Sequence, residues 1–509
     1  MMKHRILYNI ALLMLCTVWF TESSYAQRFD TAVRRNPWNE GVNRAGLRED
    51  SLSMSYAEVQ FAKQNGGMTD HSVSADSWSA GVITESVRHF SKISFTGRFA
   101  YDYTDGKDMC GSMFIRPGFY PMDIFEFTPG RKILENYSFT GGLSADLGCE
   151  WRGGLHIDFT ASNYAKRKDL RHKNTRLDFE AAPSAEWHRG DWRVGAAYIF
   201  AKNSERIEAE EIGSTPDSYE AFFDKGLFYG DRAMWDSNTI HLEESGINAF
   251  PVKEIQNGAS VQLQWRMLFG EAEYRHSSGE SGEKGVVWHT FDGDALNVKI
   301  AAVMQSAGGS QHFIRINAGW SQRDSNESIL VRETVGGITN TEIIGSIPIY
   351  AERRLSMRVE YEWLRESGSG IRTGIDWNSR NGQSSLAYPQ LREQQLGWWR
   401  LWADGVWICG RAELTAGAWI RKGCVDESAR TVASQTTSQN AYPEHLSQYA
   451  EWNAEYLTAL RAGLHAGVRI NIVKGFYAEA SARYEHGFAL KFVPQPNRIE
   501  SVVALGFKW

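Results

Sequence analysis

Alternation of apolar with polar or small side chains is the feature that most limits what this chain can fold into. The last eleven residues show it clearly: from Ile499 to Trp509, every second side chain is apolar apart from Ser501. Most of the side chains between them are small or polar, with Val502 as the exception. Successive side chains on a strand point to opposite faces, so the pattern predicts a β-strand with one apolar face.

The same two-residue period recurs along most of the chain. It is clearest in residues 93–103, 137–147, 155–162, 177–187, 261–266, 354–363, 411–421 and 476–485. The connections are alternately short, as at 148–150 and 188–191, and long, as at 203–257 and 322–350. A soluble β-sandwich has no reason to sort its loops in this way, whereas outer-membrane barrels combine short periplasmic turns with long extracellular loops.

The pattern therefore predicts an all-β fold, a transmembrane antiparallel up-and-down β-barrel of about 18 strands (14–18) with periplasmic termini and long extracellular loops. Trp151, Trp187 and Trp192 flank short turns, where an aromatic girdle at the membrane interface is expected. An aromatic content of 13% with a mean hydropathy of −0.42 fits this fold, because only half of each strand would face lipid.

The final strand, residues 499–509, resembles the C-terminal strand of bacterial outer-membrane β-barrels, which typically ends on an aromatic residue. The resemblance implies that the barrel-assembly machinery is a partner through this strand. A closed barrel has no free edge, so we expect the final strand to pair with the first, near residues 52–61. For this segment taken alone, an amphipathic edge strand of a soluble protein is the alternative.

The N-terminus has the features of a secretory signal peptide over residues 1–26. Basic residues at 3 and 5 precede an apolar run at 6–20, and Ser24-Tyr25-Ala26 offers small residues for cleavage before Gln27. A retained membrane anchor and lipidation at Cys16 are the weaker alternatives. Residues 27–50 have no period, so we expect a periplasmic or plug-like segment there, followed by the barrel over 51–509.

Charge and cysteine usage exclude several classes of function. The formal net charge is −6, and this mild acidity argues against a nucleic-acid partner. Cys110, Cys149, Cys409 and Cys424 are scattered without C-x-x-C spacing, which favours neither a disulfide framework nor a zinc site. A Cys409–Cys424 pair is the weaker alternative. No histidine spacing indicates a transition-metal site, and we predict no metal and no cofactor.

Several short motifs resemble those of one family. They are Asn36-Pro37-Trp38, Ala45-Gly46-Leu47, Gly111 to Ile115, Asp158 to Ala161 and Ala165 to Asn174. Together they resemble a family of uncharacterised outer-membrane β-barrel proteins of Bacteroidota, most clearly over about the first 200 residues. The resemblance implies a fold and a location. It implies no substrate and no catalytic residues.

Charged side chains of both signs fall on the polar face of the predicted strands and are candidates to line the lumen. They are Arg98, Asp102, His156, Asp158, Glu180, Arg193, Arg358, Glu360, Glu362, Glu413 and Arg483. At bilayer depth, such groups must face water or each other. They indicate either a hydrated channel or an interior closed by salt bridges. His156 and Asp158 could also form a catalytic pair, but a lumenal hydrogen-bond network is the favoured interpretation.

Residues 109–131 are rich in aromatic residues, proline and glycine between two clear strands. Such a segment is too apolar for a solvated loop. One interpretation is that it folds into the lumen and narrows it, with Asp123 and Glu126 at the constriction. The other is a structured extracellular cap.

A basic cluster lies in the segment 165–174, with Arg167, Lys168, Arg171 and Lys173 as its unambiguous positive charges. It could bind the anionic groups of lipopolysaccharide at the outer leaflet. It could also attract anionic solutes toward a pore, or form an ordinary solvated loop.

These features predict a barrel in the cell outer membrane of a Gram-negative bacterium, in contact with outer-membrane lipid and lipopolysaccharide. The favoured function is porin-like or gated passage of a small polar solute. An enzyme that hydrolyses lipid or peptide at the extracellular loops is the first alternative, although no convincing catalytic constellation is present. A non-conducting structural or surface-binding barrel is the second.

Overall fold

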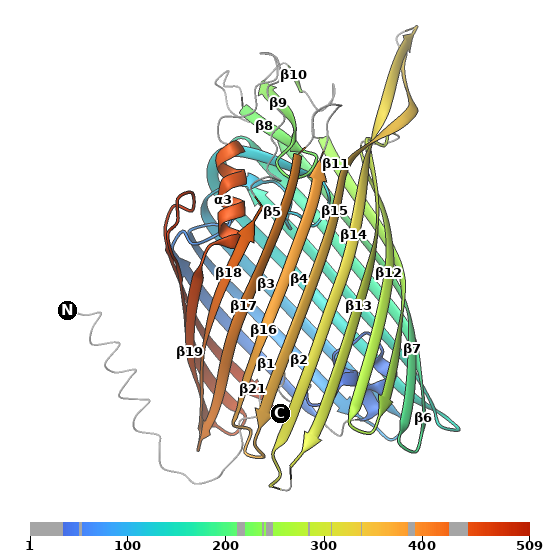
Figure 1. Cartoon of the computed structure of the whole chain (residues 1–509), viewed down its shortest axis with the longest axis vertical. Helices are drawn as coiled ribbons and strands as arrows, with labels where there is room; N and C mark the ends of the chain where they lie inside the picture. The colour runs from blue at the N-terminus through green and yellow to red at the C-terminus, as the bar shows by residue number, and fades with distance from the viewer. Residues whose placement is uncertain are drawn as a thin grey trace, which may run out of the picture.

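A closed antiparallel β-barrel dominates the computed structural model (Figure 1). The structure describes residues 34–49, 53–210, 219–236, 239–240, 248–282, 286–306, 308–336, 338–384, 392–426 and 446–509. These contain a single sheet of 21 strands, of which β8, β9 and β10 lie outside the wall, so 18 strands form the barrel. The predicted fold and strand number are thereby confirmed. The expected signal peptide lies outside the described residues.

Each wall strand pairs with its neighbours in chain order, and only the β7–β11 pair has other strands inserted between its members. The wall strands are β1 (Met54–Asn65), β2 (Asp76–His89), β3 (Ile93–Ser112), β4 (Asp123–Gly148), β5 (Trp151–Lys166), β6 (Arg171–Arg189), β7 (Trp192–Glu210), β11 (Asn248–Trp265), β12 (Leu268–Ser281), β13 (His289–Gln305), β14 (Gln311–Val335), β15 (Ile338–Leu364), β16 (Gly370–Ser384), β17 (Arg392–Cys409), β18 (Ala412–Val425), β19 (Arg461–Val473), β20 (Phe476–Gly487) and β21 (Asn497–Lys508).

The barrel closes between its first and last strands, as the sequence predicts. β1 and β21 are antiparallel from Tyr56 opposite Lys508 to Asn65 opposite Ile499. Beyond the strand end, Ser55 and Trp509 exchange backbone hydrogen bonds of 3.2 and 3.0 Å. Every ladder around the circumference is therefore continued, and the wall has no open edge. Among the described helices, none is long and apolar enough to cross a membrane.

The two faces of the wall differ in the way that the alternation predicts. On β4, Phe139 is 47% exposed on the outer face, whereas Ser144 is fully buried on the inner face. On β21, Leu505 is 66% exposed and its neighbour Ala504 is buried. The outer face is thus a continuous apolar surface, and the inner face is polar and faces the lumen.

The two ends of the barrel also differ (Figure 1). At one end, here called the turn end, two-residue turns such as Cys149-Glu150 and Gly190-Asp191 join the strands. The opposite end, here called the loop end, carries β8 (Tyr219–Asp224), β9 (Gly230–Asp236), β10 (Thr239–Ile240) and the helix α3 (Leu446–Thr458). The predicted asymmetry between short and long connections is therefore present.

Two segments predicted as long loops turn out to be strand in large part. β14 and β15 continue through 322–350 as one paired hairpin, which projects beyond the rim of the barrel (Figure 1). Strand also reaches into both ends of 203–257, in β7 and β11. The prediction of a loop at 322–350 was wrong because Ile329, Val331 and Ile343 belong to a segment rich in β-branched residues, which favours extended pairing.

Candidate functional site

A short segment of the chain lies inside the lumen near the turn end. This plug segment, residues 34–49, contains the 3-10 helices η1 (Pro37–Asn39) and η2 (Arg44–Glu49) (Figure 1). The side chain of Asn36 accepts a hydrogen bond from the backbone N–H of Trp38 and caps η1. Trp38 is 2% exposed and meets Phe269 of β12 edge-to-face, with ring centroids 5.5 Å apart. Its indole N–H donates to Gln264 of β11.

Glycines on the inner face of the wall make room for the plug segment. A Cβ added to Gly154 would overlap the backbone nitrogen of Ala45, and one added to Gly195 would overlap the side chain of Asn43. A Cβ on Gly142 would crowd the side chain of Arg44. The backbone of the wall can approach the plug segment this closely because these positions have no side chain.

Polar contacts then fix the plug segment against the wall. Asn43 donates to Gln262 of β11 at 2.9 Å, and Ser144 of β4 donates to the carbonyl of Ala45 at 2.8 Å. Glu40 lies 3.4 Å from the ammonium of Lys299 on β13. The plug segment is thus held from several sides by polar groups, together with a small apolar contact at Trp38.

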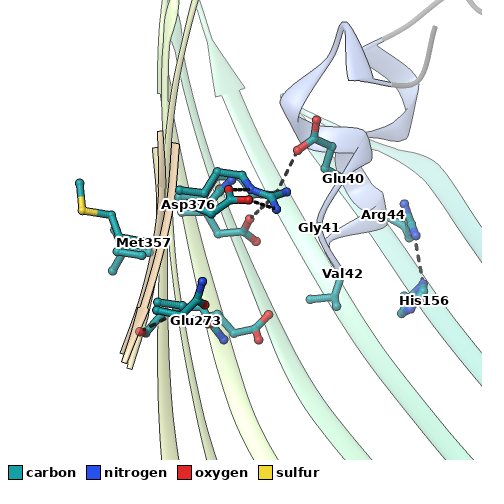
Figure 2. Close-up of a pocket in the computed structure, with 18 residues that line it drawn as sticks. Glu40, Gly41, Val42, Arg44, His156, Glu273, Met357 and Asp376 are labelled. Carbon is teal, nitrogen blue, oxygen red and sulfur yellow. Dashed lines mark hydrogen bonds and ion pairs between the residues drawn. The ribbon is translucent and has the colours of Figure 1, made fainter. Parts of the chain in front are cut away.

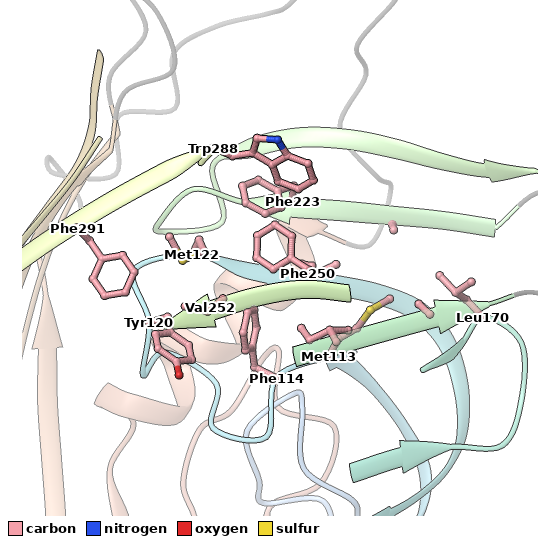
Figure 3. Close-up of a cluster of buried hydrophobic side chains, with 14 residues drawn as sticks. Met113, Phe114, Tyr120, Met122, Leu170, Phe223, Phe250, Val252, Trp288 and Phe291 are labelled. Carbon is pink, nitrogen blue, oxygen red and sulfur yellow. The ribbon is translucent and has the colours of Figure 1, made fainter. Parts of the chain in front are cut away.

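The loop end is covered by a second set of segments. The cap loop, residues 113–122, crosses the lumen and buries Phe114, Tyr120 and Met122 against Phe250 and Phe291 of the wall (Figure 3). Its contacts include a hydrogen bond of 3.1 Å from the Tyr120 hydroxyl to Asn203 of β7. The cap loop is therefore a packed lid and not a solvated connection.

Helix α3 also covers the loop end. Its Trp452 donates to the carbonyl of Thr69 and its Asn453 donates to Asp70, both at 2.7 Å. Glu455 accepts hydrogen bonds of 2.7 Å from the backbone N–H groups of residues 491–493. Tyr449 stacks on His71 with ring centroids 5.0 Å apart. The helix thereby ties together loops that are far apart in the sequence.

Cavities occupy the lumen between the cap and the plug segment. A cavity of about 620 Å³ lies under the cap loop, and one of about 510 Å³ lies beside the plug segment (Figure 2). Both are lined by Asn297, Gly319, Ser356 and Asn378, so they adjoin each other. A third cavity of about 440 Å³ lies between Arg34 and the wall strands that carry Arg372, Asp404, His465 and Arg483.

The candidate lumen residues all lie on the inner face, and most have a partner of opposite charge or a hydrogen bond. Their contacts include Arg358 to Asp376 (2.6 Å), Glu362 to Arg315 (2.7 Å), Asp158 to Thr140 (2.7 Å), Glu360 to Arg315 (3.1 Å), Asp102 to Gln60 (3.5 Å) and Arg483 to Glu500 (3.8 Å). Arg98, Arg193 and Glu413 lie on the inner face because the residue after each one is exposed on the outer face. These outer residues are Phe99, Val194 and Leu414, respectively. The interior is consequently charged but largely paired.

His156 and Asp158 have separate partners. The imidazole of His156 accepts a hydrogen bond of 3.2 Å from Arg44 of the plug segment and lies 3.8 Å from Glu180 (Figure 2). Asp158 accepts from the hydroxyl of Thr140. Glu180 is also 2.5 Å from Arg275. The arrangement is a lumenal network of the kind that the sequence favours, and it connects the wall to the plug segment.

The two acids expected at a constriction lie in the cap region and have different surroundings. Asp123 lines the cavity under the cap loop and accepts a hydrogen bond of 2.7 Å from Ser112. Glu126 is 1% exposed and lies 3.1 Å from Lys132 and 2.5 Å from Lys166. Glu126 is therefore enclosed by two lysines, and its place at a constriction stays a prediction.

The basic cluster lies at the loop end, between β5 and β6. Arg167, Lys168 and Lys173 are exposed, and Arg171 is 2.8 Å from Asp169. These three positive charges are therefore accessible to solvent at the loop end.

Sequence reasoning missed several charged residues that line the cavities, among them Arg323, Arg354 and Arg380. Arg323 lies in the segment expected to be a loop, so its face could not be assigned. Arg354 follows the same alternation as Arg358 and could have been found from it. The described residues contain no group of three or more His, Cys, Asp or Glu side chains that could hold a metal ion. Cys110, Cys149, Cys409 and Cys424 are free thiols.

Comparison with curated proteins gives no match. Among solved structures, the ferripyoverdine receptor of the outer membrane of Pseudomonas aeruginosa has a TM-score of 0.40 at 8% identity, covering 90% of this chain and 72% of the receptor. The ferric enterobactin receptor of Pseudomonas aeruginosa has a TM-score of 0.42 at 9% identity, covering 89% and 80%. The ferric preacinetobactin receptor of Acinetobacter baumannii has a TM-score of 0.38 at 8% identity, covering 90% and 80%.

One protein-family model matches almost the whole barrel. Residues 45–508 match it, from the plug segment to the end of the closing strand. The chain therefore belongs to the family described as "Family of unknown function (DUF6850)".

Proposed function

We propose that the protein is an outer-membrane barrel that passes a small polar solute through a lumen gated at both ends. One observation carries the proposal: a charged inner wall surrounds a series of cavities between a polar plug segment and a packed cap. A barrel that served only as a scaffold would be expected to fill this space with packed side chains. Here the space remains, and its lining is suited to a hydrated solute.

The outer surface supports a position in the outer membrane. Its belt of exposed aliphatic and aromatic side chains matches what lipid requires, and the polar face is turned inward. We assign the turn end, with Trp509, to the periplasm and the loop end to the outside. In this orientation, the basic cluster at 167–173 reaches the anionic groups of lipopolysaccharide. The sequence resemblance to outer-membrane proteins of Bacteroidota supports the same location.

The contacts of the plug segment suit a gate that opens reversibly. Each polar contact of this kind contributes about 0.5–1.5 kcal/mol net, because water replaces it when it breaks. The large apolar surface that would make the plug segment a permanent part of the core is limited to the surroundings of Trp38 and Leu47. The third cavity, beside Arg34, offers a route past the plug segment when its contacts loosen.

Conductance in planar lipid bilayers tests the proposal. We expect the purified protein to show rare, brief openings, which become more frequent when the plug segment is loosened by Arg44→Ala. Swelling of proteoliposomes in small sugars and amino acids would then give the size and charge preference. Complete absence of current and of swelling, for both the natural protein and the Arg44→Ala variant, would contradict the proposal and favour a non-conducting barrel.

A further inference from the structure

Three arginines from neighbouring strands line the cavity under the cap loop. They are Arg323 of β14, Arg354 of β15 and Arg380 of β16. Arg354 and Arg380 stand directly opposite each other in the β15–β16 ladder, and Arg323 stands opposite Glu352 in the β14–β15 ladder. Like charges placed directly across a sheet repel each other, so this arrangement needs a negative partner.

Glu352 supplies only part of that negative charge. Its carboxylate lies 2.5 Å from Arg354 and 2.8 Å from Arg380, and Asp224 is a second negative charge near Arg380. Arg323 lies 3.3 Å from Glu254 on its other side. The side chain of Arg354 remains 49% exposed, on the inner face of the wall. The guanidinium of Arg354 therefore stays accessible from the cavity.

The other carboxylates that line the cavity have hydrogen-bond partners of their own. Asp123 accepts from Ser112, and Asp224 accepts from the backbone N–H groups of Gly226 and Tyr229 at 3.0 and 3.1 Å. Asp70 accepts from Asn453. Charges of both signs therefore line the cavity, and among its three arginines Arg354 has the most exposed side chain.

The same arginines hold the cap loop. A guanidinium N–H of Arg323 donates to the carbonyl of Phe119, and Arg354 donates to the carbonyl of Gly118 at 3.3 Å. Both acceptors are neutral. A carboxylate or phosphate oxygen makes a charge-assisted bond to a guanidinium that is about twice as strong as a neutral one. An oxyanion in the cavity would therefore compete successfully with the cap loop for these side chains.

We propose that Arg323 and Arg354 bind the oxyanion of a small solute in this cavity, and that binding withdraws them from the carbonyls of the cap loop. The two guanidinium groups select a carboxylate or phosphate. The cavity of about 620 Å³ admits a molecule of metabolite size. Its arrival releases two of the contacts that hold the cap loop over the lumen, and so loosens the cap loop. This inference rests on the proposed function and names both the solute class and the trigger of the outer gate.

Calorimetric titration of the detergent-solubilised full-length protein tests the binding site, with succinate and inorganic phosphate as separate probes. We expect at least one probe to bind, and the double variant Arg323→Gln/Arg354→Gln to bind it about tenfold more weakly or worse. Arg353→Gln is a control, since it removes one positive charge at the outward-facing position of β15 next to Arg354. Binding of succinate alone would identify carboxylates, binding of phosphate alone would identify phosphates, and binding of both would define a general oxyanion site.

Failure to bind either probe would overturn the inference, as would equal affinity in the double variant and the natural protein. Hydrogen exchange of residues 113–122 tests the trigger: the bound probe should speed exchange in the natural protein and leave it unchanged in the double variant. Slower or unchanged exchange in the natural protein would overturn the trigger. The binding results and the conductance results test different claims. A protein that conducts without binding either probe refutes only this inference. A protein that binds but never conducts refutes the proposed function.

Discussion

Arg44 in the plug segment donates its Nε–H to Nδ1 of His156 on the barrel wall, at 3.2 Å. His156 in turn lies 3.8 Å from Glu180, which is 2.5 Å from Arg275. The position of the plug segment is therefore linked to charges that line the lumen. Any solute or substitution that rearranges these charges changes what holds the plug segment in place.

Arg44→Ala should raise the frequency of channel openings severalfold, because it removes the contact to His156 and the hydrogen bond of 2.9 Å from Arg44 to the carbonyl of Asn39. His156→Ala should have a smaller effect in the same direction. Single-channel recording measures both. Arg206→Ala is the control, since Arg206 is exposed on β7 near the loop end and pairs with Glu208. Unchanged opening in both plug-linked variants would show that this contact does not hold the gate.

Gly154→Ala should displace the plug segment, because the new Cβ overlaps the backbone nitrogen of Ala45. In the neighbouring variant Gly153→Ala, the new methyl group points outward, where only the flexible side chain of Leu147 must move. Protease accessibility of the plug segment in proteoliposomes should rise in the first variant and stay unchanged in the second. Equal protection in both variants would contradict the close approach of wall and plug segment.

Lower pH should tighten the cap near β8. Burial raises the pKa of Asp224 to about 6, and the backbone N–H groups of Gly226 and Tyr229 oppose this only in part. An aspartate in an opened cap has a pKa of about 3.9, so the closed cap binds the proton more strongly. The stabilisation is complete below about pH 4 and is lost as the pH rises through about 6.

Between pH 7.5 and 5, protonation of Asp224 contributes on the order of 1 kcal/mol to closure of this region. Hydrogen exchange of residues 219–230, corrected for its intrinsic pH dependence, should slow accordingly. Asp224→Asn keeps an acceptor oxygen for the two backbone donors but cannot titrate, so its protection should be independent of pH over this range. An identical pH profile in the natural protein and the variant would exclude Asp224 as the titrating group.

Trp509→Ala should slow assembly of the barrel. Trp509 stacks on Phe507 with ring centroids 5.7 Å apart, and its backbone pairs with Ser55 at the closing seam. The heat-modifiable band on gels reports the folded fraction in outer membranes. Trp192→Ala is a matched control, because Trp192 is also half-exposed and stacked, on Trp265, away from the seam. A similar loss in both variants would indicate a general need for interfacial aromatics and no special role for the final strand.

Replacing Arg167, Lys168 and Lys173 with glutamine should weaken binding of lipopolysaccharide by about threefold to a hundredfold, since each exposed ion pair contributes about 0.2–1 kcal/mol. Binding of fluorescent lipopolysaccharide to the detergent-solubilised protein measures this. Lys92→Gln with Lys474→Gln removes charge from the turn end and should leave binding unchanged. Full affinity in the triple variant would identify the basic cluster as an ordinary solvated surface.

The wall of the barrel follows from local sequence pattern. Side chains that face lipid must be apolar, and they alternate with side chains that face the lumen. This requirement applies along every spanning strand, so the pattern recurs many times in a single sequence. The order of short and long connections sets the up-and-down topology. The apolar alternation of residues 499–509 likewise predicted the closing seam with β1, which the structure contains.

Only the tertiary structure decided what fills the lumen. The plug segment and the cap loop have no period, and their partners lie on strands far away in the sequence, such as Gln262 for Asn43 and Phe291 for Tyr120. Contacts between irregular segments and a wall depend on which strands the closed barrel brings opposite each other. The sequence by itself determined a barrel with a polar interior, whereas three-dimensional closure determined that Arg323 and Arg354 share a cavity under the cap loop.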